Sequence, residues 1–430
     1  MQVHLTTLGC RLNEAELENW ASGFMSIGHA ITQTPEQADV VVINTCAVTQ
    51  DAVRKSRQLI RRSHRNNPIA KLVVSGCYSS LNKTLADEIE GIDLVVPNQD
   101  KEKLVEIAIQ ELNMLAMPSE ATAPGESSLF KRGRQRAFIK IQDGCRYRCT
   151  FCIVTVARGS ERSRTIKDIV TEINLLTSQG IHEAVLTGVH VGGYGNDIQT
   201  NLYELINAIL SETDLPRLRL ASVEPWDLPD KFFELFSNPR LMPHMHLPLQ
   251  SGSDSVLKRM SRRCKTADFK HLLDYAKNEV PDFNVTTDVI VGFPGESESE
   301  WQESLDFISS IEFSHIHIFS YSERDGTKAA ELPDQVNRDV KKRRSVQLHQ
   351  LAAEKKKSYL EKHINREFSI LWEGSTKIEN TAITRYFGYT PNFIRTQIDI
   401  NSNEILTNKI QQAKITSVNP NVENVLSIKI

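Results

Sequence analysis

The sequence predicts an α/β protein built from three successive regions. At 430 residues the chain is too long for one ordinary hydrophobic core, so two or three domains are expected. Strand and helix patterns alternate through the first two regions and give way to short β-rich runs in the third. We place these regions at residues 1–114, 130–363 and 366–430.

The first region reads as a parallel sheet with helices between its strands. Short buried strands are expected at 4–8, 39–44 and 71–75, and helices at 14–26, 48–65 and 81–90. A polar stretch at 118–128 has the composition of a linker. It separates this region from the second one.

The second region carries six further strand patterns, most of them followed by a helical pattern. The expected strands are 137–142, 183–187, 217–222, 244–247, 285–291 and 315–320, and a long charged helix at 336–363 follows them. Six such units predict a partial parallel barrel, with chemistry at the carboxyl-terminal ends of its strands. The third region predicts a small all-β barrel or sandwich, with strands at 368–372, 381–386, 393–400 and 425–430.

Six of the seven cysteines fall into two sets of three. Cys145, Cys149 and Cys152 lie on one short loop, whereas Cys10, Cys46 and Cys77 each come directly after a predicted strand. Parallel strands deliver their carboxyl ends to one edge of a sheet, so the scattered set can also meet. Three thiolates can hold three irons of a four-iron cluster and leave the fourth iron without a protein ligand.

Other interpretations of the cysteines remain open at this point. A zinc site needs a fourth Cys or His near Cys145–Cys152, and none lies between residues 144 and 153. A disulfide is disfavoured by the odd count and by the reducing compartment that we expect. The scattered set could also be three unrelated core thiols.

The net charge of -3 indicates no particular partner, but the distribution of basic residues does. Arg54, Arg57, Arg61 and Arg65 share one face of a predicted helix, and a second cluster includes Arg132. Both clusters fit phosphate contact as well as a solvated surface. No apolar run reaches the ~18–20 residues of a membrane helix and no secretory signal is present, so a cytoplasmic location is expected.

The loop Cys145-Arg-Tyr-Arg-Cys149-Thr-Phe-Cys152 resembles the signature of radical S-adenosylmethionine (SAM) enzymes. In that superfamily the open iron of a [4Fe-4S] cluster binds SAM, and reductive cleavage gives a 5′-deoxyadenosyl radical. Motifs at the ends of the predicted barrel strands fit the same superfamily. The resemblance implies cofactor contacts at Gly188, His190, Ser222, Glu224, Gln250, Asp288 and Ile290.

The segments around Cys10, Cys46 and Cys77 resemble the amino-terminal domain of methylthiotransferases, and residues 388–393 resemble their RNA-binding TRAM domain. The resemblance implies two [4Fe-4S] clusters, SAM, an electron donor such as flavodoxin or ferredoxin, and no membrane partner. It also implies that the anticodon loop of a tRNA is the substrate, with Arg57, Arg61 and Arg132 as RNA contacts.

Within this family the chain is most similar to the type that inserts a methylthio group at C2 of N6-threonylcarbamoyladenosine next to the anticodon. Two other types remain alternatives, one acting on isopentenyladenosine in tRNA and one on an aspartate of a ribosomal protein. A tRNA-binding, cluster-containing regulator without catalysis is a further alternative.

Overall fold

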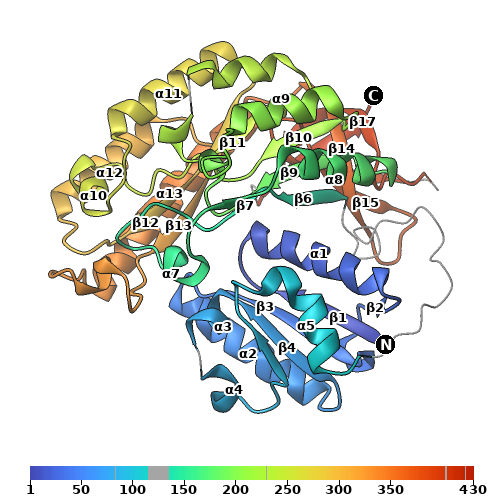
Figure 1. Ribbon diagram of the computed structural model, residues 1–430. Helices are drawn as coiled ribbons and strands as arrows, with labels where there is room; N and C mark the ends of the chain where they lie inside the picture. Colours follow the sequence, from blue (N-terminus) through green and yellow to red (C-terminus); the bar gives the residue numbers. More distant parts are fainter. Residues whose placement is uncertain (83, 115–134, 229, 402–403, 422) are drawn as a thin grey trace.

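A computed structural model describes residues 1–82, 84–114, 135–228, 230–401, 404–421 and 423–430 (Figure 1). The expected linker at 118–128 and Arg132 lie outside the described residues. No helix within the described ranges is long and apolar enough to cross a membrane.

The amino-terminal region forms the predicted parallel sheet, which has five strands in the order β2-β1-β3-β4-β5. Its strands are β1 (Gln2–Thr7), β2 (Ala30–Ile31), β3 (Val40–Thr45), β4 (Lys71–Gly76) and β5 (Leu94–Val96). The helices are α1 (Arg11–Ser26), α2 (Gln50–Asn66), α3 (Cys77–Leu81), α4 (Leu85–Glu88) and α5 (Leu104–Glu111). Apolar side chains of α1 and α5 cover one face of the sheet, and those of α2 and α3 cover the other.

The expected single helix at 81–90 is wrong, because the chain forms two short helices there and α3 already begins at Cys77. Gly76 makes this early start feasible. Its φ of +103° favours glycine, and a Cβ at this position would lie 2.3 Å from the carbonyl oxygen of Thr45. The tight turn therefore places Cys77 directly at the end of β4.

The central region is the predicted partial barrel of six parallel strands. It comprises β6 (Arg136–Lys140), β9 (Glu183–Thr187), β10 (Arg217–Leu220), β11 (His244–His246), β12 (Asn284–Val291) and β13 (His315–Ser320). Two three-stranded sheets, β6-β9-β10 and β11-β12-β13, are joined by parallel bridges from Leu218 to Leu241 and from Ser222 to His246. Its core is the largest apolar cluster, and Trp301 and Phe313 are among its fully buried side chains.

Helices cover the outside of this barrel (Figure 1). They are α8 (Ile166–Ser178), α9 (Leu202–Glu212), α10 (Asp254–Arg259), α11 (Thr266–Glu279), α12 (Glu298–Ser310) and α13 (Arg338–Glu361). The long helix expected at 336–363 is therefore present as α13. The short helix α7 (Val154–Arg158) lies instead between the barrel and the amino-terminal region, in contact with α3 (Figure 1). A small ribbon of β7 (Gln142–Asp143) and β8 (Arg162–Ser163) flanks the compact cysteine loop.

The carboxyl-terminal region is a closed five-stranded barrel, which settles the earlier choice between barrel and sandwich. Its strands are β14 (Glu367–Lys377), β15 (Thr384–Tyr389), β16 (Arg395–Ile400), β17 (Ile410–Val418) and β18 (Val425–Lys429). Strand β17 was not predicted, because Gln412, Lys414 and Thr416 alternate with buried Ala413 and Ile415 and few of its residues are large and apolar.

The carboxyl-terminal barrel packs against the amino-terminal ends of the central strands. Arg217, the first residue of β10, donates to the carbonyl oxygen of Ser369 at 2.6 Å. Arg136, the first residue of β6, forms an ion pair with Glu373. The ring of Phe393 stacks on His244 with centroids 4.5 Å apart. One end of the central barrel is closed in this way.

The amino-terminal region meets the central barrel through α1, which packs against β6 (Figure 1). A buried ion cluster lies at this contact. Arg158 of α7 reaches Glu16 of α1 at 2.8 Å and Asp143 of β7 at 3.1 Å, and it donates to Asn13 at 2.7 Å. Arg158, Glu16 and Asp143 are each no more than 4% exposed.

Two lysines complete this ion cluster. Lys101 pairs with both carboxylates, and Lys140 lies 3.1 Å from Asp143. Burial alone would raise the pKa of Glu16, but Arg158, Lys101 and Lys140 together lower that pKa to about 2. Since the pKa is lowered in the folded state, this stabilisation is present above the ordinary value of 4.5 and is lost as the pH falls toward 2.

We predict that Arg158→Met destabilises the protein by about 3–5 kcal/mol at pH 7, because two buried carboxylates lose a partner. Urea unfolding followed by tryptophan fluorescence measures this change. Arg54→Met is the matched control, because the Arg54 side chain is 78% exposed and its removal should cost no more than about 0.5 kcal/mol. Equal urea midpoints for the two variants would contradict the prediction.

Candidate active site

The compact cysteine set lies on the loop between β7 and α7, at the carboxyl-terminal side of β6. The backbone N–H of Cys145 donates to Gly159 at 3.1 Å, and that of Cys152 donates to Cys149 at 3.0 Å. These bonds fold the loop back on itself. Burial raises the pKa of Cys145 to about 12 and that of Cys152 to about 11, so a bound metal must displace the thiol protons.

The scattered cysteine set meets at one edge of the amino-terminal sheet, as the strand positions predict. Cys10 lies between β1 and α1, Cys46 follows β3, and Cys77 begins α3. Gly9 allows the backbone before Cys10 to pass close to Cys46, because a Cβ at Gly9 would lie 2.8 Å from the sulfur of Cys46. Cys10 is exposed, whereas Cys46 and Cys77 are buried.

Arg158 connects the two cysteine sets. It follows Cys152 by six residues, and its Nε lies 3.3 Å from the sulfur of Cys77. Burial is the main cause of the raised pKa of Cys152, and the thiols of Cys149 and Cys77 add to it. The compact set and the scattered set are therefore electrostatic neighbours.

The donor sets fit iron–sulfur clusters better than single ions. The described groups that bring three ligand atoms within 4.8 Å of one another are His246–Asp288–His317 and His190–Glu224–Asp227, and neither cysteine set is among them. A single tetrahedral ion needs such close ligands, whereas a four-iron cube spreads its thiolates over separate corners. Each set offers three thiols and leaves one corner to another ligand.

A cavity of about 620 Å³ occupies the lumen of the central barrel and reaches the scattered set. The loop at the start of α1 forms one wall and contributes Gly9, Cys10, Arg11, Leu12 and Glu14. The carboxyl ends of β9, β10 and β11 contribute Thr187, Gly188, Ser222 and His246, and the middle parts of β12 and β13 contribute Asp288 and His317. Arg136, Arg219, His244 and Phe393 lie toward the end that the carboxyl-terminal barrel closes.

The structure places three of the expected cofactor contacts, Gly188, Ser222 and Asp288, on this cavity wall. Gly188 is needed for close packing, since a Cβ there would lie 3.1 Å from the carbonyl oxygen of Gln142. Glu224 lies at the compact set, where its charge contributes to the raised pKa of Cys145 after burial. Its Oε2 accepts no hydrogen bond from the described residues.

His190 lies beneath the compact loop, away from the cavity lining. Its Nδ1 is 2.6 Å from Glu161 and its Nε2 is 2.6 Å from Asp227. Burial disfavours the charged imidazole, but these carboxylates raise the pKa of His190 overall. Tyr147 of the loop donates to Asp227 at 2.8 Å and packs edge-on against His190. This arrangement lets His190 support the loop.

Gln250 and Ile290 are tied to each other at the end of β12. Gln250 has a φ of +74°, and its backbone N–H donates to the carbonyl oxygen of Asp288 at 2.8 Å. The N–H of Ile290 donates back to Gln250 at 2.9 Å. Neither residue lines the cavity. A cofactor could contact them only outside this cavity, beyond the carboxyl ends of the strands.

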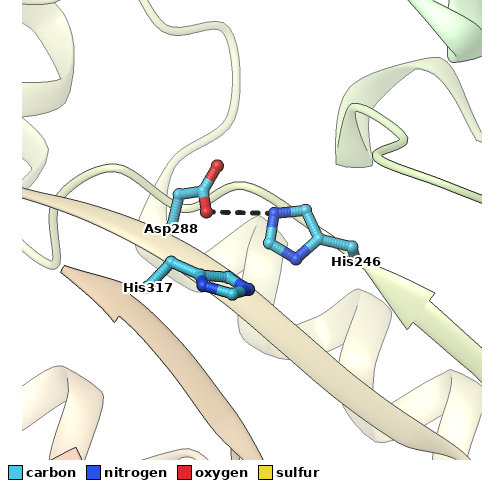
Figure 2. Close-up of side chains that lie close together, drawn as sticks. All are labelled: His246, Asp288 and His317. Atoms are coloured by element: carbon cyan, nitrogen blue, oxygen red, sulfur yellow. Dashed lines mark ion pairs between the residues drawn. The ribbon is translucent and has the colours of Figure 1, made fainter. Parts of the chain in front are cut away.

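Inside the cavity, the expected contact Asp288 forms a polar cluster with two histidines that were not predicted as site residues (Figure 2). Figure 2 shows His246, Asp288 and His317 facing one another from three neighbouring strands. His246 forms an ion pair with Asp288 at 3.2 Å and contacts the hydroxyl of Thr286 at 2.9 Å. His317 occupies a position that alternates with buried Ile316, which is the sequence signal for a lumen-facing residue.

The expected RNA contacts on α2 lie on its exposed face. They line a surface groove together with Arg54, Arg62 and Arg65. Arg57 is partly engaged, because it donates to the hydroxyl of Tyr78 at 2.5 Å and pairs with Glu88 at 3.2 Å. Tyr78 directly follows Cys77, so the basic face and the scattered set are in contact.

Comparison with known proteins identifies two matched regions. Residues 139–308 match the radical SAM superfamily, and residues 2–97 match a family described as uncharacterized protein family UPF0004. The radical SAM match implies SAM and a [4Fe-4S] cluster as cofactors, and the matched residues include the compact set. Among solved structures, a radical SAM methyltransferase, TsrM from Kitasatospora setae, shares the fold, with a TM-score of 0.57 and 15% identity over 76% of this chain and 77% of that one.

Curated relatives are similar over nearly the whole chain. A threonylcarbamoyladenosine tRNA methylthiotransferase MtaB from Bacillus subtilis is 37% identical, covering 95% of this chain and 92% of its own length. The MtaB protein of Rickettsia prowazekii is 34% identical over 93% and 92%. A tRNA-2-methylthio-N6-dimethylallyladenosine synthase from Staphylococcus haemolyticus is 33% identical over 89% and 77%. The chain therefore belongs to the radical SAM tRNA methylthiotransferase family.

Proposed function

We propose that this enzyme inserts a methylthio group at C2 of N6-threonylcarbamoyladenosine, next to the anticodon of a tRNA. The observation that carries the proposal is the single cavity that Cys10 shares with the strand ends of the radical SAM barrel. Relatives named MtaB, such as those from Bacillus subtilis and Rickettsia prowazekii, support the choice of nucleoside.

We assign the compact set to the cluster that binds SAM, and Cys10, Cys46 and Cys77 to a second [4Fe-4S] cluster. When bound, SAM and the clusters supply sulfur, a methyl group and a radical that takes hydrogen from C2 of the adenine. The chain's own residues orient these groups and exclude water. Oε2 of Glu224 accepts no hydrogen bond from the described residues and lies 3.7 Å from Nε2 of His190, so it is free to accept one from the ribose hydroxyls of SAM.

The remaining cofactor contacts stay as predicted from the sequence: Gly188, His190, Ser222, Gln250, Asp288 and Ile290. Glycine at 188 leaves room for the amino group of SAM, and Ser222 offers a hydroxyl at the same level of the barrel. We expect His190 to act by holding the loop that carries Cys145.

We assign residues 1–114 to the second cluster, 130–363 to SAM chemistry and 366–430 to RNA binding as a TRAM barrel. Arg57 and Arg61 are proposed to contact phosphates of the anticodon stem-loop, and Arg132 is proposed to do the same from outside the described residues. Such loops present unstacked bases that enter a pocket readily. A flavodoxin or ferredoxin is the expected electron donor, and the tRNA substrate favours a cytoplasmic location.

The first prediction from this proposal concerns cellular tRNA. Cells without the gene should lose 2-methylthio-threonylcarbamoyladenosine and accumulate the form without the methylthio group. Mass spectrometry of nucleosides from total tRNA measures both. Loss of 2-methylthio-isopentenyladenosine instead would move the substrate to the alternative type, and no change in any nucleoside would favour the ribosomal-protein substrate.

A second prediction concerns Cys46. Cys46→Ala should remove the second cluster and lower the iron content from about eight to about four atoms per chain. The variant should still cleave SAM under reduction but insert no sulfur. Cys264→Ala is the matched control, because Cys264 belongs to neither set and its thiol contacts the carbonyl oxygen of Lys265. Sulfur insertion by Cys46→Ala at the wild-type rate would refute the assignment.

A third prediction concerns the basic face of α2. Replacing Arg57 and Arg61 by Gln should weaken tRNA binding and lower the slope of log Kd against log salt by about 1–2. Fluorescence anisotropy with a labelled anticodon stem-loop gives this slope. Lys270→Gln, an exposed change on α11, should leave the slope unchanged. An unaltered slope in the double variant would exclude these phosphate contacts.

A further inference from the structure

The cavity described above is rich in cations. Arg11, Arg136 and Arg219 line it, together with the acids Glu14 and Asp288. Arg219 is 2% exposed, and its Nε and Nη2 donate hydrogen bonds to Glu183. Its Nη1 has no hydrogen-bond partner among the described residues. This lining favours an anionic occupant.

Arg11 is the cavity cation that is most able to exchange its partner. Arg136 and Arg219 are held by the buried carboxylates Glu373 and Glu183. Arg11 is paired with Glu14 at 3.2 Å within the first turn of α1, and the Arg11 side chain is 54% exposed. An exposed pair of this kind contributes little stability, so a bound carboxylate can replace it.

The surroundings of Arg11 prepare it for an anion. Its guanidinium lies over the ring of Phe138, 4.9 Å from the centroid, which fixes its plane and leaves its N–H edge available. Arg11 is also the first residue of α1, a helix of 16 residues whose first backbone N–H groups donate no capping hydrogen bond to the side chain of Cys10. The positive end of the helix dipole therefore adds to the charge of the arginine.

His317 lies close to Arg11 in the same cavity. Burial lowers the pKa of His317, Asp288 opposes this shift, and the charges of His246 and Arg11 add to it. The ring of His317 faces Asp288 in the cavity and can offer an N–H donor to an anion there. His246 differs, because both of its ring nitrogens are engaged by Asp288 and Thr286.

We propose that Arg11, assisted by His317, binds the carboxylate of the threonylcarbamoyl group and so selects the substrate nucleoside. This inference rests on the proposed function. Arg11 directly follows Cys10, where C2 of the adenine must approach the sulfur. The threonylcarbamoyl group is attached through N6 to C6 of the same six-membered ring. One ring nitrogen, N1, lies between C6 and C2. An arginine fork binds a carboxylate through two parallel hydrogen bonds.

The test compares two anticodon stem-loops that differ in one group. One carries N6-threonylcarbamoyladenosine, and the other carries its carboxamide, which lacks the negative charge. For both RNAs, kcat/KM for methylthiolation and Kd are measured with the wild-type enzyme, Arg11→Gln and Arg11→Lys. Lys270→Gln, an exposed cation on α11 outside both the cavity and the basic face of α2, is the matched control.

Arg11→Gln should lower kcat/KM for the carboxylate RNA about 10- to 100-fold and change the carboxamide RNA less than about twofold. Arg11→Lys should retain part of the preference, because it keeps the charge but loses the fork. An equal loss on both RNAs would overturn the proposal, since Arg11 would then act on a phosphate or on the fold. The proposal would also be overturned if Arg11→Gln kept the wild-type preference for the carboxylate RNA over the carboxamide RNA.

The binding measurement separates this subsite from the proposed function. A wild-type enzyme that binds the carboxylate RNA more tightly, loses that preference in Arg11→Gln and yet methylthiolates neither RNA would refute the function and support the subsite. A wild-type enzyme that methylthiolates the carboxylate RNA and keeps its preference in Arg11→Gln would refute the subsite and support the function.

Discussion

The arrangement of the whole site depends on the buried ion cluster around Arg158. A guanidinium that is 4% exposed is tolerated only when carboxylates and other acceptors surround it. Glu16 comes from α1 and Asp143 from the strand before the compact loop, so the cluster forms only when the amino-terminal region is seated on the barrel. Arg158 also contacts the sulfur of Cys77, so this side chain of the central region reaches the scattered cysteine set directly.

A second constraint is geometric. Six strands cannot close a barrel of this kind, so the lumen stays open on one side until another part of the chain covers it. Helix α1 supplies that cover and brings Cys10 and Arg11 into the cavity wall. The carboxyl-terminal barrel closes the other end through Phe393 and Glu373. All three regions therefore contribute walls to one cavity.

The sequence predicted those features that depend on local patterns. Strands such as 183–187 and 315–320 were placed without error, because alternation and turn residues mark them. The meeting of Cys10, Cys46 and Cys77 followed from the direction of parallel strands. Strands β2 and β5 were missed, since two or three residues give no periodic signal.

The features that sequence analysis missed depend on long-range contacts. Nothing in the local sequence distinguishes Arg158 from the other arginines, because its partners Glu16 and Cys77 are far away in the sequence. His317 needs the register of β13 against β12 before it meets Asp288. The basic face of α2 was visible in the spacing of its arginines, but the bond from Arg57 to Tyr78 was not.

The scattered cysteines differ in exposure. Cys46 and Cys77 are buried between the sheet and its helices, whereas Cys10 is exposed and lines the lumen. The side of this set that Cys10 occupies is therefore the side that faces the barrel. A group held by the three thiolates would border the lumen beside Gly188, Ser222 and Asp288. The buried charges around Arg158 hold the amino-terminal region in the position that gives this arrangement.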